Sequence, residues 1–83
     1  MLRNEYAMPI VLRIRGFKFF FFSQEGNEPA HIHVNKGDGA AKFWLGPLKL
    51  AYNDGFKKQE LGIIIAILER HEAELIRAWN EIE

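Results

Sequence analysis

Residues 10–22 read IVLRIRGFKFFFF. Two runs of aliphatic and aromatic residues, Ile10–Ile14 and Phe17–Ser23, flank the dipeptide Arg15-Gly16, and this arrangement predicts a β-hairpin. Side chains alternate between the two faces of a strand. One face of the second strand then carries Phe17, Phe19 and Phe21, and the other carries Lys18, Phe20 and Phe22. Aromatic residues on both faces predict a central strand, covered on both sides or lying at a dimer contact.

The sheet is expected to continue after this hairpin. Further strands are predicted over His31–Asn35 and Ala40–Leu45, with a short fifth strand over Leu48–Tyr52. Glycine, asparagine and proline mark the segment Gln24–Ala30 as a loop, and the glycine-rich Lys36–Gly39 as a turn.

The last third of the chain has the apolar spacing of a helix. The repeating positions are Leu61, Ile64, Ile65, Leu68, Leu75, Ile76, Trp79 and Ile82. Asn53 or Asp54 could cap this helix at its start. One continuous helix and two helices joined by a kink near His71 both fit the pattern. The predicted fold is therefore α+β: a small antiparallel sheet of four to five strands, followed by a long or kinked C-terminal helix.

Length and composition limit what this chain can be. Its 83 residues fit one domain, expected over residues 8–83, with residues 1–7 as a disordered leader. It has no cysteine, so a disulfide framework and a thiolate metal site are excluded, and its 48% hydrophobic residues must supply the core. We expect a cytoplasmic protein, because no apolar run is long enough to span a membrane.

His31 and His33 form the chemically richest pattern in the sequence. Two residues apart on a strand, they lie on one face, with Glu25 and Glu28 just upstream in a loop. Two imidazoles and a carboxylate can transfer protons or bind phosphate, so His31, His33 and Glu28 are the candidate catalytic residues. The spacing fixes no third metal ligand, so no metal and no cofactor are predicted. A purely structural histidine pair fits the spacing equally well.

Basic residues gather around the first hairpin. Arg13, Arg15 and Lys18 are the candidate substrate-binding residues, because a small cationic patch can bind phosphate. Alternation would place Arg13 and Arg15 on one strand face. The alternative is a solvated edge that discourages aggregation. Lys and Arg together equal Asp and Glu, at 11 each, so any RNA contact must depend on such a local patch.

The stretch Met8–Val34 resembles a bacterial domain family of unknown function, the one numbered 4160. The resemblance centres on Glu25-Gly26-Asn27-Glu28-Pro29-Ala30-His31-Ile32-His33-Val34 and extends over nearly the whole chain from Met8. Family members commonly have a second proline where this chain has Ala30. The resemblance implies a small cytoplasmic bacterial protein, encoded beside another small gene and grouped with toxin–antitoxin pairs. It implies a fold and a partner more than a reaction, and it adds weight to the two histidines.

Two functions follow as hypotheses, and the sequence leaves open whether the chain is an enzyme. The first is the toxin-like component of a two-gene module, a metal-independent ribonuclease in which His31 and His33 act as base and acid. The alternative is a non-enzymatic module for protein binding or oligomerisation, with a structural histidine pair. The expected partners are a small protein encoded nearby, a second copy of the chain, or RNA, and no membrane.

Overall fold

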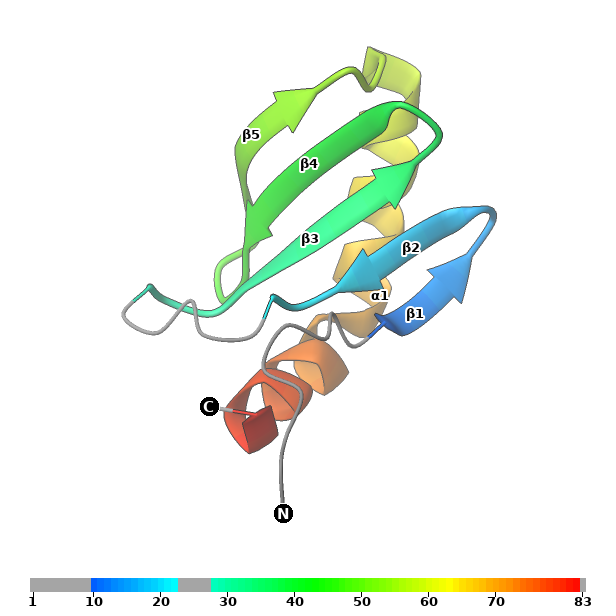
Figure 1. Ribbon diagram of the computed structural model, residues 1–83. Helices are drawn as coiled ribbons and strands as arrows, with labels where there is room; N and C mark the ends of the chain where they lie inside the picture. Colours follow the sequence, from blue (N-terminus) through cyan, green and yellow to red (C-terminus); the bar gives the residue numbers. More distant parts are fainter. Residues whose placement is uncertain (1–9, 23–27, 83) are drawn as a thin grey trace.

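A computed structural model describes residues 10–22 and 28–82. Five strands form one antiparallel sheet in the order β1-β2-β3-β4-β5, and one helix, α1, follows (Figure 1). The elements are β1 (Ile10–Ile14), β2 (Phe17–Phe20), β3 (His31–Lys36), β4 (Gly39–Trp44), β5 (Lys49–Asp54) and α1 (Lys58–Ile82). The predicted α+β fold is confirmed, including the fifth strand. The predicted leader, residues 1–7, lies outside the described residues.

The β1–β2 hairpin closes through a turn that needs positive φ angles. Arg15 has a φ of 56° and Gly16 a φ of 85°, the backbone form that matches the twist of two-residue hairpins. Arg15 therefore belongs to the turn. The prediction that it shares a strand face with Arg13 is wrong, because alternation ends where the strand ends.

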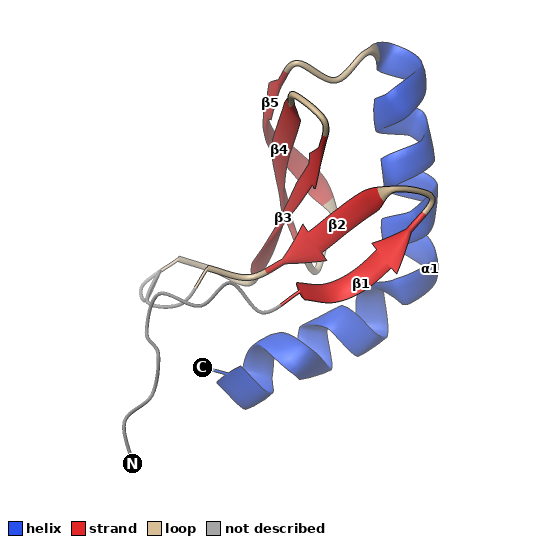
Figure 2. Ribbon diagram, turned by 45° about the vertical axis from the view of Figure 1, so that its right-hand side comes forward, coloured by secondary structure: helices blue, strands red, loops and turns tan. Residues whose placement is uncertain are grey.

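Helix α1 covers one face of the sheet and forms the core with it (Figure 2). The buried side chains from the sheet include Phe17, Phe19, Phe21, Ile32, Val34, Ala41, Phe43 and Leu45, and those from the helix include Ile64, Ile67, Leu68, Leu75 and Trp79. The aromatic strand β2 is an interior strand, with β1 and β3 on its two sides, and it ends at Phe20, before its predicted bound. Between the two predicted alternatives, the structure has one continuous helix of 25 residues. Its second half bends beneath the end of the sheet (Figure 2).

The start of α1 is fixed by residues other than the predicted caps. The Glu60 carboxylate accepts a hydrogen bond of 2.9 Å from the backbone N–H of Lys57, and the N–H of Leu61 donates to the Lys57 carbonyl. The Glu60 bond is the half of a capping box that the third helical residue supplies, and the Leu61 bond is the first bond of the helix itself. Asn53 instead clamps the preceding turn, because its side-chain amide bonds both the N–H and the carbonyl of Phe56. No helix in the described part of the chain is long and apolar enough to cross a membrane.

Substitution of two glycines should have opposite effects on stability. A Cβ at Gly39 would lie 2.5 Å from the buried Phe56 ring, so Gly39→Ala should lower the free energy of unfolding by about 1–3 kcal/mol. A Cβ at Gly62, inside the helix, meets nothing within 4 Å, so Gly62→Ala should raise it by about 1 kcal/mol. Urea denaturation of both variants measures this. Equal stability of Gly39→Ala and the wild type would contradict the packing described.

Candidate functional site

Strand β3 presents His31 and His33 on the sheet face opposite the main core. Ile32 and Val34, which alternate with them, are fully buried beneath the helix. The two imidazole rings are adjacent, with centroids 5.3 Å apart and planes at 82°. The structure therefore confirms that the histidine pair lies side by side on one strand.

His31 is completely buried. Its Nδ1 donates a hydrogen bond of 2.8 Å to the Pro29 carbonyl, only two residues upstream. Trp44, its register partner in β4, meets the imidazole ring edge-on, with ring centroids 5.7 Å apart. The ring centroid of Trp79, from the helix, lies 4.8 Å from that of His31. Trp79 also contacts Phe21 of the main core, at 5.5 Å. The bend of the helix thus brings one tryptophan around the end of the sheet to cover His31.

His33 lies in an aromatic setting and is 5% exposed. Its ring stacks on Phe20, its register partner in β2, with centroids 5.7 Å apart and planes within 18°. Phe22 meets the ring edge-on at 4.5 Å. On the other side, the register places Lys42 of β4 directly opposite His33. Stacked rings of this kind stabilise by packing as well as by burial.

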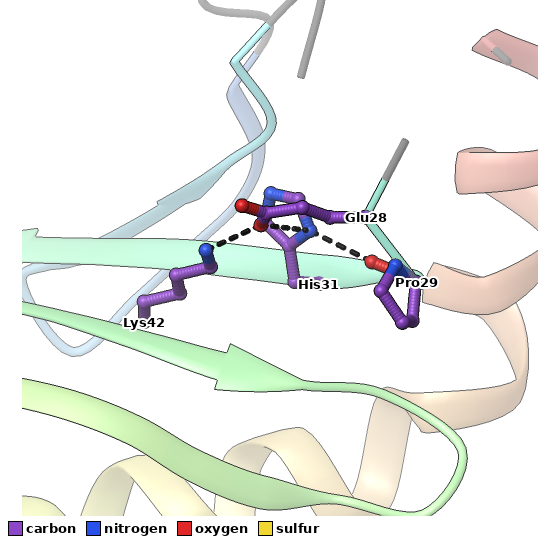
Figure 3. Close-up of polar contacts among 4 residues, drawn as sticks. All are labelled: Glu28, Pro29, His31 and Lys42. Carbon is purple, nitrogen blue, oxygen red and sulfur yellow. Dashed lines mark hydrogen bonds and ion pairs between the residues drawn. The ribbon is translucent and has the colours of Figure 1, made fainter. Parts of the chain in front are cut away.

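Glu28 links this strand to the next through its carboxylate (Figure 3). One oxygen, Oε1, accepts a hydrogen bond of 2.5 Å from Lys42 Nζ and lies 3.7 Å from His31 Nδ1. The Lys42 side chain is 12% exposed and that of Glu28 is 45% exposed. Lys42 Nζ also lies 4.6 Å from the centre of the Trp44 ring, a cation–π distance. Glu28, His31 and Lys42 form one polar cluster, which we call the histidine clamp.

The histidine clamp is satisfied internally. In residues 10–22 and 28–82, no buried side-chain nitrogen or oxygen lacks a hydrogen-bond partner. Across the same residues, no group of three or more histidine, cysteine and carboxylate side chains could hold a metal ion. Such an arrangement fixes loop, strand and tryptophan relative to one another. Proton transfer to a substrate would additionally require an imidazole that the substrate can reach.

The candidate phosphate-binding residues do not converge on the histidines. Arg13 and Lys18 are register partners and share the outer sheet face. Lys18 lies opposite Asn35, and this pair is two residues nearer the hairpin turn than the Phe20–His33 pair. Arg15 lines a separate cavity beside the helix. The structure therefore brings together Glu28, His31 and His33, and leaves Arg13 and Lys18 nearer the hairpin turn and Arg15 in that turn.

Two residues of the site were not predicted from the sequence, Lys42 and Trp79. Lys42 could have been placed by its register, because β3 and β4 join through a two-residue turn at Gly37-Asp38, and counting outward sets Lys42 opposite His33. Trp79 was predicted as one of the apolar positions of the helix, and it is buried. Its contact with His31 depends on the bend of the helix, which no spacing reveals. Glu25 lies outside the described residues.

Comparison with known proteins places this site within a family. Residues 16–80 match the sequence profile described as "Domain of unknown function (DUF4160)". The match runs from the hairpin turn through most of the helix, and so includes the whole histidine clamp. No curated protein and no solved structure shows significant similarity to the chain.

Replacing His31 should destabilise the fold more than breaking the ion pair beside it. His31→Leu fills the space but leaves the partner of a part-buried hydrogen bond, the Pro29 carbonyl, without its donor, which should cost about 1–3 kcal/mol of unfolding free energy. Glu28→Gln only weakens a partly exposed ion pair and should cost less than about 1 kcal/mol. Urea denaturation compares the two. Wild-type stability of His31→Leu would show that the imidazole does not hold the fold together.

Proposed function

The chain belongs to the DUF4160 family, and from this premise we propose that it is a protein-binding module, the partner-linked component of a two-gene, toxin–antitoxin-type pair in the bacterial cytoplasm. The family resemblance is the reason to expect a second small protein as the partner. The exposed apolar side chains of this chain are the reason to favour protein binding over catalysis.

Exposed apolar side chains on the two edge strands carry the proposal. Ile10 on β1 is 42% exposed, and Leu50 and Tyr52 on β5 are 39% and 49% exposed. These strands are the first and last in the sheet order, so each has one side without a strand among the described residues. An open strand edge with apolar side chains favours pairing with another chain.

The buried histidines support the same proposal. An imidazole that is 0% or 5% exposed, packed against tryptophan and phenylalanine, is placed to hold the fold rather than to meet a substrate. In this proposal the histidine clamp keeps the loop residues Glu28 and Pro29 in place at the start of β3.

Co-expression with the product of the adjacent small gene tests the proposal. We expect the two proteins to purify together, and the mass of the complex in solution to exceed that of either chain. Light scattering on the complex and on each chain alone gives these masses. A strictly monomeric chain that captures neither the neighbouring product nor a second copy would rule out the binding module.

A second candidate function, action on RNA, is favoured by the composition of the outer sheet face. Register places Phe20, His33, Lys42 and Tyr52 in one row across β2 to β5. Exposed Phe22 and Tyr52, together with Arg13 and Lys18, offer rings for base stacking and cations for phosphate. Here the chain would be the toxin-like partner, with His33 and His31 as the acid–base pair and Glu28 orienting His31.

Growth and cleavage assays test this second candidate. Expression of the chain alone should arrest growth, the purified protein should cleave RNA, and His33→Ala should abolish cleavage. Tyr52→Ser, which removes one stacking ring, should weaken RNA binding about fivefold, corresponding to ~1 kcal/mol. If the wild type and His33→Ala cleave equally, or neither does, the catalytic role of the histidines is refuted.

A further inference from the structure

We infer that the free edge of β1, together with the cavity between its turn and α1, binds an extended segment of a partner protein in which apolar and acidic residues alternate. The inference rests on the proposed protein-binding function and names the surface and the chemistry of the partner. The segment would pair with β1 as an added strand.

The edge of β1 is open and flanked by hollows. β1 pairs only with β2, and no other strand in the described part of the chain lies along its second side (Figure 1). One hollow, of about 250 Å³, runs along Ile10–Arg13. A second, of about 430 Å³, lies between Ile14 at the end of β1 and the helix residues Ile63 and Ile67. A strand on this edge could place side chains in both hollows.

The second hollow joins an apolar floor to a cationic rim. Ile14, Ile63 and Ile67 supply the apolar side chains, Arg15 and Arg70 supply the cationic rim, and His71 lies beside them. Ile67 is almost fully buried and Ile63 partly so, and the floor is therefore continuous with the core. Such a hollow suits an aliphatic side chain next to a carboxylate.

Charge determines the kind of partner. Arg13, Arg15 and Arg70 are all exposed, and within residues 10–22 and 28–82 none of them forms an ion pair or a side-chain hydrogen bond. Glu74, about one helical turn from Arg70, is already bound to His71, with 2.9 Å between Oε1 and Nδ1. Unpaired guanidinium groups at the rim favour carboxylates on the partner.

The same charges disfavour a second copy of this chain on this edge. β1 carries Arg13 and no acidic residue, so pairing two copies of β1 would bring like charges together. The other edge strand differs, because β5 carries both Lys49 and Asp54. The cationic β1 edge therefore selects a different, acidic chain.

A peptide in which valine alternates with glutamate tests the surface directly. In nuclear magnetic resonance titrations it should shift the amide signals of β1 and of residues 63–71, and leave those of β5 unchanged. The double variant Arg15→Asn/Arg70→Gln should bind about tenfold more weakly, equal to ~1.4 kcal/mol. Asparagine tolerates the positive φ of position 15, so the turn should survive. A peptide with lysine in place of glutamate should not bind.

The matched control is Lys49→Gln/Arg77→Gln. It also removes two positive charges, but away from this surface, and it should bind the peptide like the wild type. Shifts confined to β5, or equal affinity of the Arg15/Arg70 variant and the wild type, would overturn the inference.

Co-purification distinguishes a failure of this inference from a failure of the proposed function. If the neighbouring protein still binds the Arg15/Arg70 variant as tightly as the wild type, binding stands and this surface is refuted. If no natural partner binds but the peptide does, the surface stands and the proposed function fails.

Discussion

A single helix must cover a five-stranded sheet that is aromatic on both faces, and this constraint governs the rest of the structure. Helix α1 buries Phe17, Phe19 and Phe21 on one face. Phe20, on the other face, is still only 5% exposed, in part because His33 stacks on it. The second half of the helix bends around the end of the sheet, and Trp79 then serves both faces by contacting Phe21 and His31. A chain of this size buries a smaller share of its surface than a larger domain does, so each buried ring matters more to its stability.

The histidine clamp follows from that burial. An imidazole can replace an apolar ring beneath Trp79 only if its polar atoms are bonded, because an unpaired buried donor or acceptor is costly. The loop just before β3 supplies the partners: the Pro29 carbonyl accepts from Nδ1, and the Glu28 carboxylate lies between His31 and Lys42. Within the run that resembles the family, Glu28 and His31 therefore hold the loop before β3 to the sheet.

The sequence allowed the strands and the helix to be predicted, but not the tertiary contacts between them. β1 was located to the residue and β3, β4 and β5 to within two residues, because strand alternation and glycine turns are local signals, whereas β2 ends at Phe20, before its predicted bound. The helix was foreseen with two alternatives, one continuous helix and a kink near His71, and the structure has one continuous helix whose second half bends. Lys42 was missed although its register was implicit in the Gly37-Asp38 turn, whereas Trp79 contacts His31 through a tertiary bend that leaves no periodic trace. Arg15 was misplaced because positive φ in the turn ends the strand alternation.

The histidines proposed to act on RNA and the cationic hollow proposed to bind a partner segment lie in different parts of the structure. The histidine clamp and the row from Phe20 to Tyr52 lie on the outer face, whereas the cationic hollow of Arg15 and Arg70 lies beside the helix. Among the described residues Arg15 and Arg70 form no side-chain hydrogen bond or ion pair, so their substitution breaks no polar contact of the histidine clamp. Effects of distant, independent sites add. A loss of partner binding on changing Arg70 therefore says nothing about His33, and the roles of fold, partner and RNA can be assigned to separate residues.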